Sequence, residues 1–234
     1  MKRRMRGSFF AAGLSLFAFL ILTVLVKTVD VKPIGPLDSK VGLATINGAV
    51  FHTYGSNPIW YTLSEILGYL SIAVAAGFCL LGLWQWIQRK HLKKVDHDLL
   101  ALYGAYGVMA AFYLLFEIVV INYRPILEEG ALAPSYPSSH TLLVCCIMLT
   151  AVTQLRIRIR PRALRIGGTA FCGAVILLTA LGRIFSGVHW YTDVFASLLI
   201  GNAVGCAYSG VRQWLRIKAR AARRRKQLSA GTEE

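Results

Sequence analysis

The sequence predicts an all-α protein that crosses a membrane six times. Of its 234 residues, 56% are hydrophobic and only 16% are charged, whereas a soluble domain carries about 25% charged residues. The apolar residues form six stretches, each long enough for a membrane helix or nearly so. The basic residues gather in alternate connections between these stretches, which is the charge pattern of a polytopic membrane protein.

Six spans are expected from the length of the apolar stretches, because a helix needs about 20 residues to cross the hydrocarbon layer. The first stretch carries no charge, and Lys27 to Asp30 do not resemble a signal-peptide cleavage site, so an uncleaved span is expected. The fourth stretch is short, so its ends are expected to be buried in protein. The expected spans are Gly7–Val26, Trp60–Ile87, Leu99–Asn122, Thr141–Leu155, Ala163–Leu181 and Trp190–Val211.

The basic residues predict that both termini are cytoplasmic. All but five of the 26 Lys and Arg residues lie in the N-terminus, the second-to-third connection, the fourth-to-fifth connection and the C-terminal tail. Basic residues of short loops collect on the cytoplasmic side. The net charge of +15 is therefore attributed to topology, and no nucleic-acid partner is expected. The five exceptions are Lys27, Lys32, Lys40, Arg124 and Arg183.

The chain divides into an N-terminal two-helix region with an outer loop (1–98), a four-helix region (99–211) and a basic tail (212–234). Within the outer loop, Val41–Phe51 is expected to form a short helix on the membrane surface. The tail around Trp214–Lys226 suits anionic headgroups, or serves only as a topology anchor. The cysteines lie in the spans and are expected to be buried small hydrophobic residues, namely Cys79, Cys145, Cys146, Cys172 and Cys206.

Polar residues collect at the extracytoplasmic ends of the last four spans. Ionisable residues at such positions are costly and therefore mark a functional site. His189 and Asp193 are four residues apart and would share a helix face, so that the carboxylate could orient a nucleophilic imidazole. The set comprises Glu117, Asn122, Arg124, Ser138, Ser139, His140, Arg183, His189 and Asp193.

These residue types suit phosphoryl transfer. The segment Pro137 to His140 leads into a helix N-terminus, where free N–H groups favour an anion. Arg124 and Arg183 could grip phosphate oxygens. Each feature alone has another explanation. His189 and Asp193 could form a zinc half-site or a satisfied buried pair, and Arg124 could be a snorkelling arginine. The segment Pro137 to His140 could be a simple helix cap. A metal-dependent hydrolase built from His140, His189, Asp193 and Glu117 is a further alternative.

The same residues resemble the type 2 phosphatidic acid phosphatase (PAP2) family of membrane lipid phosphatases. Its blocks KxxxxxxRP, PSGH and SRxxxxxHxxxD are matched by Glu117-x6-Arg124-Pro125, Pro137-Ser138-Ser139-His140 and Gly182-Arg183-x5-His189-x3-Asp193. The resemblance implies an all-α fold without a metal or other cofactor. It also implies that His189 is the nucleophile, that Asp193 orients it and that His140 is the general acid and base. Phosphate would be held by Arg124, Arg183, Ser138 and Ser139.

Three positions depart from the family pattern: Glu117 replaces a lysine, Ser139 a glycine and Gly182 a serine. Glu117 is the most consequential, because it places a negative charge where a cation would meet phosphate. It is expected to pair with Arg124 or Arg183; alternatively, it faces a cationic part of the substrate, or the site is impaired.

The resulting hypothesis is a phosphatase of the bacterial plasma membrane that acts on a lipid phosphate at the outer face. Phosphatidic acid, lysophosphatidic acid, phosphatidylglycerol phosphate and polyprenyl diphosphate are all compatible substrates. The alternatives are a catalytically impaired lipid-phosphate binder and a transporter. A transporter would place its polar residues near the membrane midplane, and here they lie at one interface. The oligomeric state is not predicted.

Overall fold

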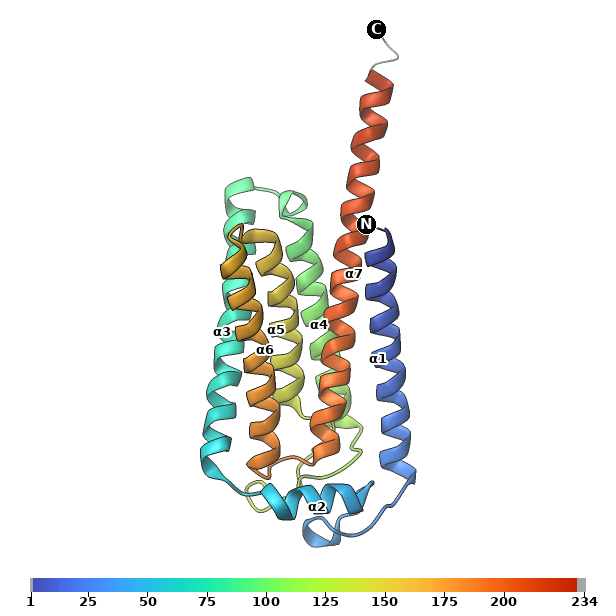
Figure 1. Ribbon diagram of the computed structural model, residues 1–234, viewed down its shortest axis with the longest axis vertical. Helices are drawn as coiled ribbons and strands as arrows, with labels where there is room; N and C mark the ends of the chain where they lie inside the picture. Colours follow the sequence, from blue (N-terminus) through green and yellow to red (C-terminus); the bar gives the residue numbers. More distant parts are fainter. Residues whose placement is uncertain (1, 231–234) are drawn as a thin grey trace.

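The computed structural model describes residues 2–230, except for the side chains of 223–226 and 228–230. The part of the chain so described is helical and contains no β-strand (Figure 1). Six helices are long and apolar enough to cross a membrane, as the sequence predicts. These helices are α1 (Lys2–Thr28), α3 (Pro58–Arg89), α4 (His97–Ile118), α5 (Ser139–Arg158), α6 (Arg162–Phe185) and α7 (Tyr191–Ala230).

Helix α5 is the central helix of the bundle and packs against α3, α4, α6 and α7. The helix has 20 residues and is thus longer than the apolar stretch that predicts it. More than half of its apolar part is buried, which agrees with the expectation that protein encloses its ends. Gly201 and Gly205 of α7 allow close packing, because a Cβ at Gly201 would lie 2.7 Å from Cys145 of α5. Helix α1 lies outside this group and packs along α7.

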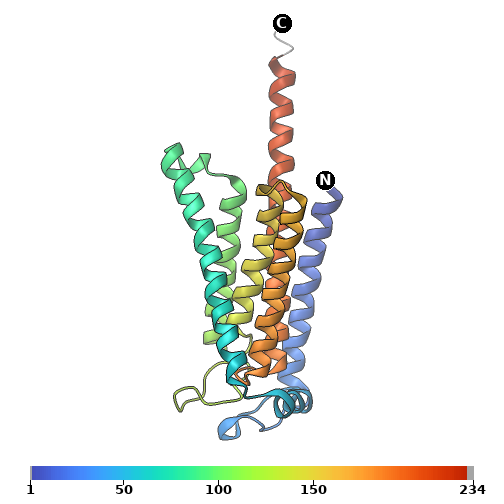
Figure 2. The same cartoon turned by 60° about the vertical axis from the view of Figure 1, so that its left-hand side comes forward.

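A short helix, α2 (Ala44–Tyr54), lies across the end of the bundle opposite to the start of α1 and the C-terminal part of α7 (Figures 1 and 2). The sequence predicts a surface helix at nearly this position. Asn47 fixes α2 to the start of α7: its side chain donates to Thr192 Oγ1 at 3.0 Å and accepts from Thr192 N at 3.2 Å. Asn47 is fully buried, so this pair determines how α2 covers the bundle.

Several expected boundaries differ from those of the structure. Helix α4 ends at Ile118, so Asn122 lies in the following loop, where its Oδ1 accepts from Gly42 N at 3.5 Å. Helix α7 continues to Ala230 and includes most of the expected tail, whose last residues, 231–234, lie outside the described chain. Cys79 is exposed and Cys206 is half-buried, so the expectation of five buried cysteines is wrong.

The N-terminal end of α1 and the C-terminal part of α7 lie at the same end of the bundle (Figure 1). The side of the membrane that this end faces stays a prediction from the distribution of basic residues. The opposite end carries α2 and the loop between α4 and α5, and the predicted site residues lie at this end.

Candidate active site

The loop of residues 119–138 folds back on itself and onto the start of α7. Arg124 N donates to Ala133 O, and Ser135 N donates to Asn122 O, each at 3.0 Å. Trp190 Nε1 donates to Tyr123 O at 2.7 Å. These bonds satisfy backbone groups that would otherwise lack partners at a buried depth, and they bring the loop into contact with His189.

His189 lies in the turn before α7 and is 3% exposed. Its Nδ1 is 3.1 Å from Ser135 O, which selects the tautomer that is protonated at Nδ1. Its Nε2 is buried without a hydrogen-bond partner among the described residues. Burial lowers the pKa of His189 well below its usual value, and the positive charges of Arg183 and Arg124 lower it further. These observations favour a neutral imidazole whose Nε2 has no hydrogen-bond partner in the described chain.

Gly187 makes the turn into His189 possible. Its φ of +70° belongs to the left-handed region, and a Cβ there would lie 2.8 Å from Ser56 N. Glycine adopts this conformation without steric cost.

Asp193 is fully buried in the first turn of α7. Its Oδ2 accepts from Trp190 N at 2.9 Å and from the Ser135 hydroxyl. The same oxygen lies 3.7 Å from His189 Nδ1, which is beyond hydrogen-bond distance. Because His189 precedes α7, the two side chains do not share a helix face as expected. Asp193 instead holds Ser135, whose carbonyl orients His189.

His140 and Arg183 meet at a carboxylate that the motifs do not contain. Glu65 of α3 lies 3.1 Å from His140 Nε2 and accepts from Arg183 Nη1 at 2.7 Å. Arg183 is 1% exposed, its Nη2 is 3.4 Å from His140 Nδ1, and its Nε has no partner among the described residues. Arg183 therefore lies beside His140 through Nη2 and keeps one N–H donor, at Nε, without a partner in the described chain.

The serines lie at the N-terminus of α5, as predicted. Ser138 is the N-cap: its hydroxyl accepts from Thr141 N at 3.5 Å, and its own N–H donates to Asp193 O at 3.2 Å. Ser139 begins the helix and is half-buried. The first N–H groups of a helix have no partner within it, so they are available to an anion.

Arg124 forms an ion pair, whereas Glu117 forms none in the described chain. Arg124 Nε donates to Pro134 O at 3.3 Å, and its Nη1 pairs with Glu128 at 3.3 Å. Glu117 is exposed in the last turn of α4 and forms no ion pair within the described chain. The expectation that Glu117 pairs with Arg124 or Arg183 is therefore wrong, because Glu128 and Glu65 occupy those positions.

The glycine at position 182 is explained by the close approach of α3. A Cβ at Gly182 would lie 2.9 Å from Ser64 Cβ and 3.0 Å from Trp60 O. The Ser64 hydroxyl lies 3.5 Å from Arg183 Nη1. Ser64 thus provides a hydroxyl near Arg183 where the serine of the family pattern is missing.

Two adjoining hollows open onto these residues. A narrow pocket of about 10 Å³ is lined by His189, Ser135, Ser139 and the end of α4, including Glu117. A cavity of about 380 Å³ lies between α3, α4 and α5, with Glu65, Ser139 and His140 at one end. Its other lining residues are mainly apolar: Gly68, Tyr69, Ile72, Met109, Ala110, Tyr113, Leu142 and Leu143.

Sequence reasoning missed Glu65 and Ser135 as site residues. Glu65 carried a signal, since a carboxylate within an apolar span is costly without a partner. Ser135 carried none, because its role depends on a loop fold that local sequence does not reveal. Among the described residues, no group of three or more His, Cys, Asp or Glu side chains is arranged to hold a metal ion.

A family model and a solved structure agree with this architecture. Residues 68–217 match the family model of the PAP2 superfamily. The structure resembles that of a transmembrane PAP2-type phosphatidylglycerolphosphate phosphatase from Bacillus subtilis, with 16% identity and a TM-score of 0.65 over 87% of this chain and 96% of that one. LpxE of Aquifex aeolicus matches with 24% identity over 70% of this chain and 90% of that one, at a TM-score of 0.39. No curated protein sequence matches significantly. The family match covers well over half of the sequence, and the chain belongs to the PAP2 superfamily.

Proposed function

We propose that the protein is a membrane phosphatase that removes a terminal phosphate from a lipid through a phosphohistidine intermediate. The observation that carries this proposal is the free Nε2 of a buried, neutral His189 at the end of the bundle where Arg183 and His140 meet. A neutral imidazole beside fixed positive charges suits attack on a phosphorus atom whose oxygens are negative.

The proposed reaction gives each of the two histidines its own role. Nε2 of His189 attacks phosphorus, the bond between phosphorus and the lipid oxygen breaks, and His140 gives its proton to that oxygen. A water molecule then attacks the phosphohistidine, giving a proton to His140 while the bond between phosphorus and nitrogen breaks. Phosphate leaves and both histidines return to their starting states. None of these steps requires a metal ion or other cofactor.

The phosphate oxygens would be held by positive charge and by backbone donors. Arg183 offers its unpartnered Nε, and the N-terminus of α5 offers the N–H groups of Ser139 and His140. Arg124 adds charge from the loop. Such groups stabilise the charge of the transferring phosphoryl group, which is the main protein contribution in this chemistry.

The apolar cavity between α3, α4 and α5 supports a lipid as the substrate. It adjoins His140 and Glu65 at its polar end and continues along apolar side chains of the spans. A phosphate at the polar end would place an acyl or isoprenoid chain in this cavity. The predicted topology places the site on the extracytoplasmic side, and the headgroup would enter from the outer leaflet.

Glu65 would act on the reaction through His140 and Arg183. Its carboxylate stabilises the protonated imidazole of His140, which must donate to the leaving oxygen. It also partly neutralises Arg183 and thereby weakens the binding of a phosphate in the ground state. We therefore assign Glu65 as a positioning residue that favours turnover over tight binding.

Phosphate release by the purified protein tests the proposal. The substrates are lipid phosphates and diphosphates in detergent, with EDTA present and a His189→Ala variant as control. Release that persists in EDTA and is lost in the variant supports a metal-independent phosphatase. Absence of release from the folded protein, with lipid phosphates still bound, would instead favour a catalytically impaired lipid-phosphate binder.

A further inference from the structure

A large hollow lies at the end of the bundle opposite to the active site. It has a volume of about 1420 Å³ and is bordered by α1, α5, α6 and α7. Helices α1 and α6 form opposite walls and do not contact each other within the described chain. Six arginines line it: Arg4, Arg156, Arg162, Arg165, Arg212 and Arg216.

The arginines of the hollow form no ion pair with an acidic residue in the described part of the chain. No Asp or Glu lines the hollow, and none of the six arginines forms an ion pair within 4 Å in the described chain. Other arginines at this end are paired: Arg158 contacts Asp98 at 2.9 Å, and Arg89 contacts Asp96 at 2.9 Å. Arg156, Arg212 and Arg216 also border a neighbouring hollow that Asp96 and Asp98 line. Even so, positive charge far exceeds negative charge around the arginine-lined hollow.

The rest of the lining suits a molecule that is part polar and part apolar. Ser8, Ser209 and Gln213 form a hydrogen-bonded group, in which Gln213 Nε2 donates to Ser8 Oγ at 3.2 Å and to Ser209 O at 3.1 Å. Farther along the helices, Ala11, Ile166, Ala170 and Cys206 present apolar or weakly polar surface. An anionic headgroup at the arginines would have its chains beside these residues.

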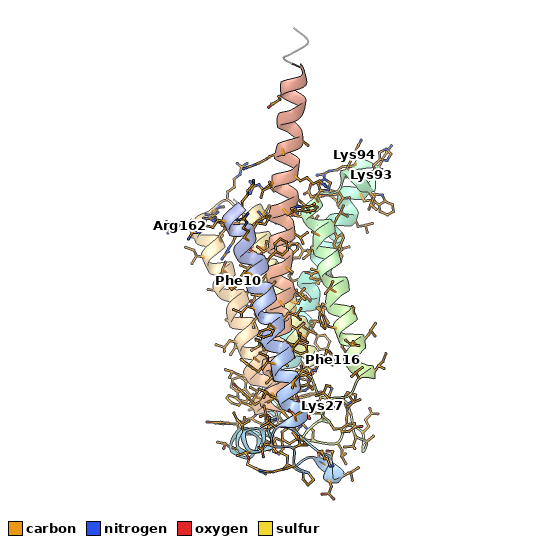
Figure 3. All side chains as sticks on the ribbon, turned by 90° about the vertical axis from the view of Figure 1, so that its right-hand side faces the viewer. Phe10, Lys27, Lys93, Lys94, Phe116 and Arg162 are labelled. Atoms are coloured by element: carbon orange, nitrogen blue, oxygen red, sulfur yellow. The ribbon has the colours of Figure 1, made fainter. Side chains whose placement is uncertain are left out.

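The hollow lies where the headgroups of one leaflet would be. Figure 3 shows Arg162 at the same end of the molecule as the start of α1, with Lys93 and Lys94 on the other side of α7. Basic pockets between membrane helices bind lipids with several negative charges, because each nearby arginine or lysine adds attraction to the headgroup.

We propose that this arginine-lined hollow binds a membrane lipid whose headgroup carries two or more phosphate charges. Six guanidinium groups that form no ion pair in the described chain exceed what a single phosphodiester can balance, so a headgroup with two phosphates is the better match. The site is separate from the active site and does not depend on the proposed phosphatase function.

Lipid retention by the full-length protein tests the proposal. The protein is purified in mild detergent, and native mass spectrometry follows the binding of added cardiolipin, phosphatidylglycerol and soluble pyrophosphate. The test variant is Arg4→Gln/Arg162→Gln/Arg165→Gln. The matched control is Lys90→Gln/Lys93→Gln/Lys94→Gln, which removes the same charge at the same end but outside the hollow. Thermal unfolding of both variants verifies that they are folded.

Cardiolipin should bind the wild type and the lysine variant equally, and phosphatidylglycerol more weakly. The arginine variant should lose about 100-fold in cardiolipin affinity, at about 1 kcal/mol for each removed arginine. Equal losses in both variants, or equal binding of cardiolipin and phosphatidylglycerol, would overturn the proposal. Binding of pyrophosphate with the affinity of cardiolipin would also overturn it, because the site would then recognise a soluble anion.

Discussion

The Oε1 atom of Glu65 lies 2.7 Å from Nη1 of Arg183, across 118 positions of the sequence. This ion pair joins α3 to α6 and places a carboxylate beside His140. Residue 65 precedes the part of the chain that matches the family model, which begins at 68. The site is therefore completed by a helix that the recognised motifs do not include.

Replacing Glu65 by glutamine should separate turnover from binding. Loss of the carboxylate frees Arg183 for phosphate and so lowers KM, while His140 loses the charge that favours its proton. We expect kcat to fall at least about tenfold, but less than the roughly 100-fold or more that removal of a general acid costs. The fall should be larger for an alkyl phosphate than for an aryl phosphate, whose leaving group needs less protonation.

Glu129→Gln is the matched control for that experiment. It removes the same charge at the same end of the bundle, from a side chain that is exposed, lines neither hollow of the candidate site and forms no ion pair in the described chain. We expect its kinetic constants to stay within about twofold of wild type, as for most exposed positions. Equal effects of the two variants, or a fall in kcat that is independent of the leaving group, would contradict the role of Glu65.

The dependence of kcat/KM on pH should change when the charges near His189 are altered. A free imidazole gains a proton below about pH 6.5, but burial and the charges of Arg183 and Arg124 lower the pKa of His189. His189 therefore stays neutral as the pH falls below that value. Arg124→Gln removes one positive charge, so the pKa of His189 rises and the acidic limb of kcat/KM moves to higher pH. A limb that stays in place or moves to lower pH would contradict this electrostatic coupling.

Restoring the family serine at position 182 should destabilise the protein. In Gly182→Ser, the new Cβ meets Ser64 and the Trp60 carbonyl at about 3 Å, and overpacking of this kind costs about 1–3 kcal/mol. We expect a lower unfolding temperature in detergent and reduced activity. Gly173→Ser on the same helix is the control, because a Cβ at Gly173 would have no atom within 4 Å. Equal unfolding temperatures of the two variants would show that α3 does not pack so closely.

Filling the apolar cavity should affect long-chain substrates selectively. Ala110 lines the cavity, so Ala110→Phe should raise KM for a long-chain lipid phosphate about 5- to 100-fold, the equivalent of about 1–3 kcal/mol of overpacking. A short-chain phosphate should be hydrolysed as before. The neighbouring Ala111 is exposed and does not line the cavity, so Ala111→Phe should leave both substrates unaffected. Equal KM changes for short and long chains would exclude the cavity as the chain site.

The spans and the motif residues could be predicted because their signals are local. Length and hydropathy define a membrane helix, and charge between helices defines topology. The end of α4 could not be predicted in this way, because the apolar run of Val119, Val120 and Ile121 continues after the helix has ended. There Asn122 turns inward to contact Gly42, a partner 80 positions away.

The supporting contacts of the site could not be predicted because they join residues that are far apart in the sequence. Asn47 and Thr192 are 145 positions apart, and Ser135 and Asp193 are 58 apart. Polar residues of these types occur in many loops, and only the assembled bundle shows which of them meet. The motif side chains of the candidate site could thus be identified from the sequence, whereas the groups that orient them could not.

Trapping the reaction intermediate tests the central claim most directly. The protein is mixed with an aryl phosphate that carries radiolabelled phosphate, quenched rapidly in base, and digested to locate the label. We predict an alkali-stable, acid-labile phosphate on His189, which is absent in His189→Ala and accumulates in His140→Asn. Phosphate release by His189→Ala at the wild-type rate, or label on another residue, would contradict nucleophilic catalysis by His189.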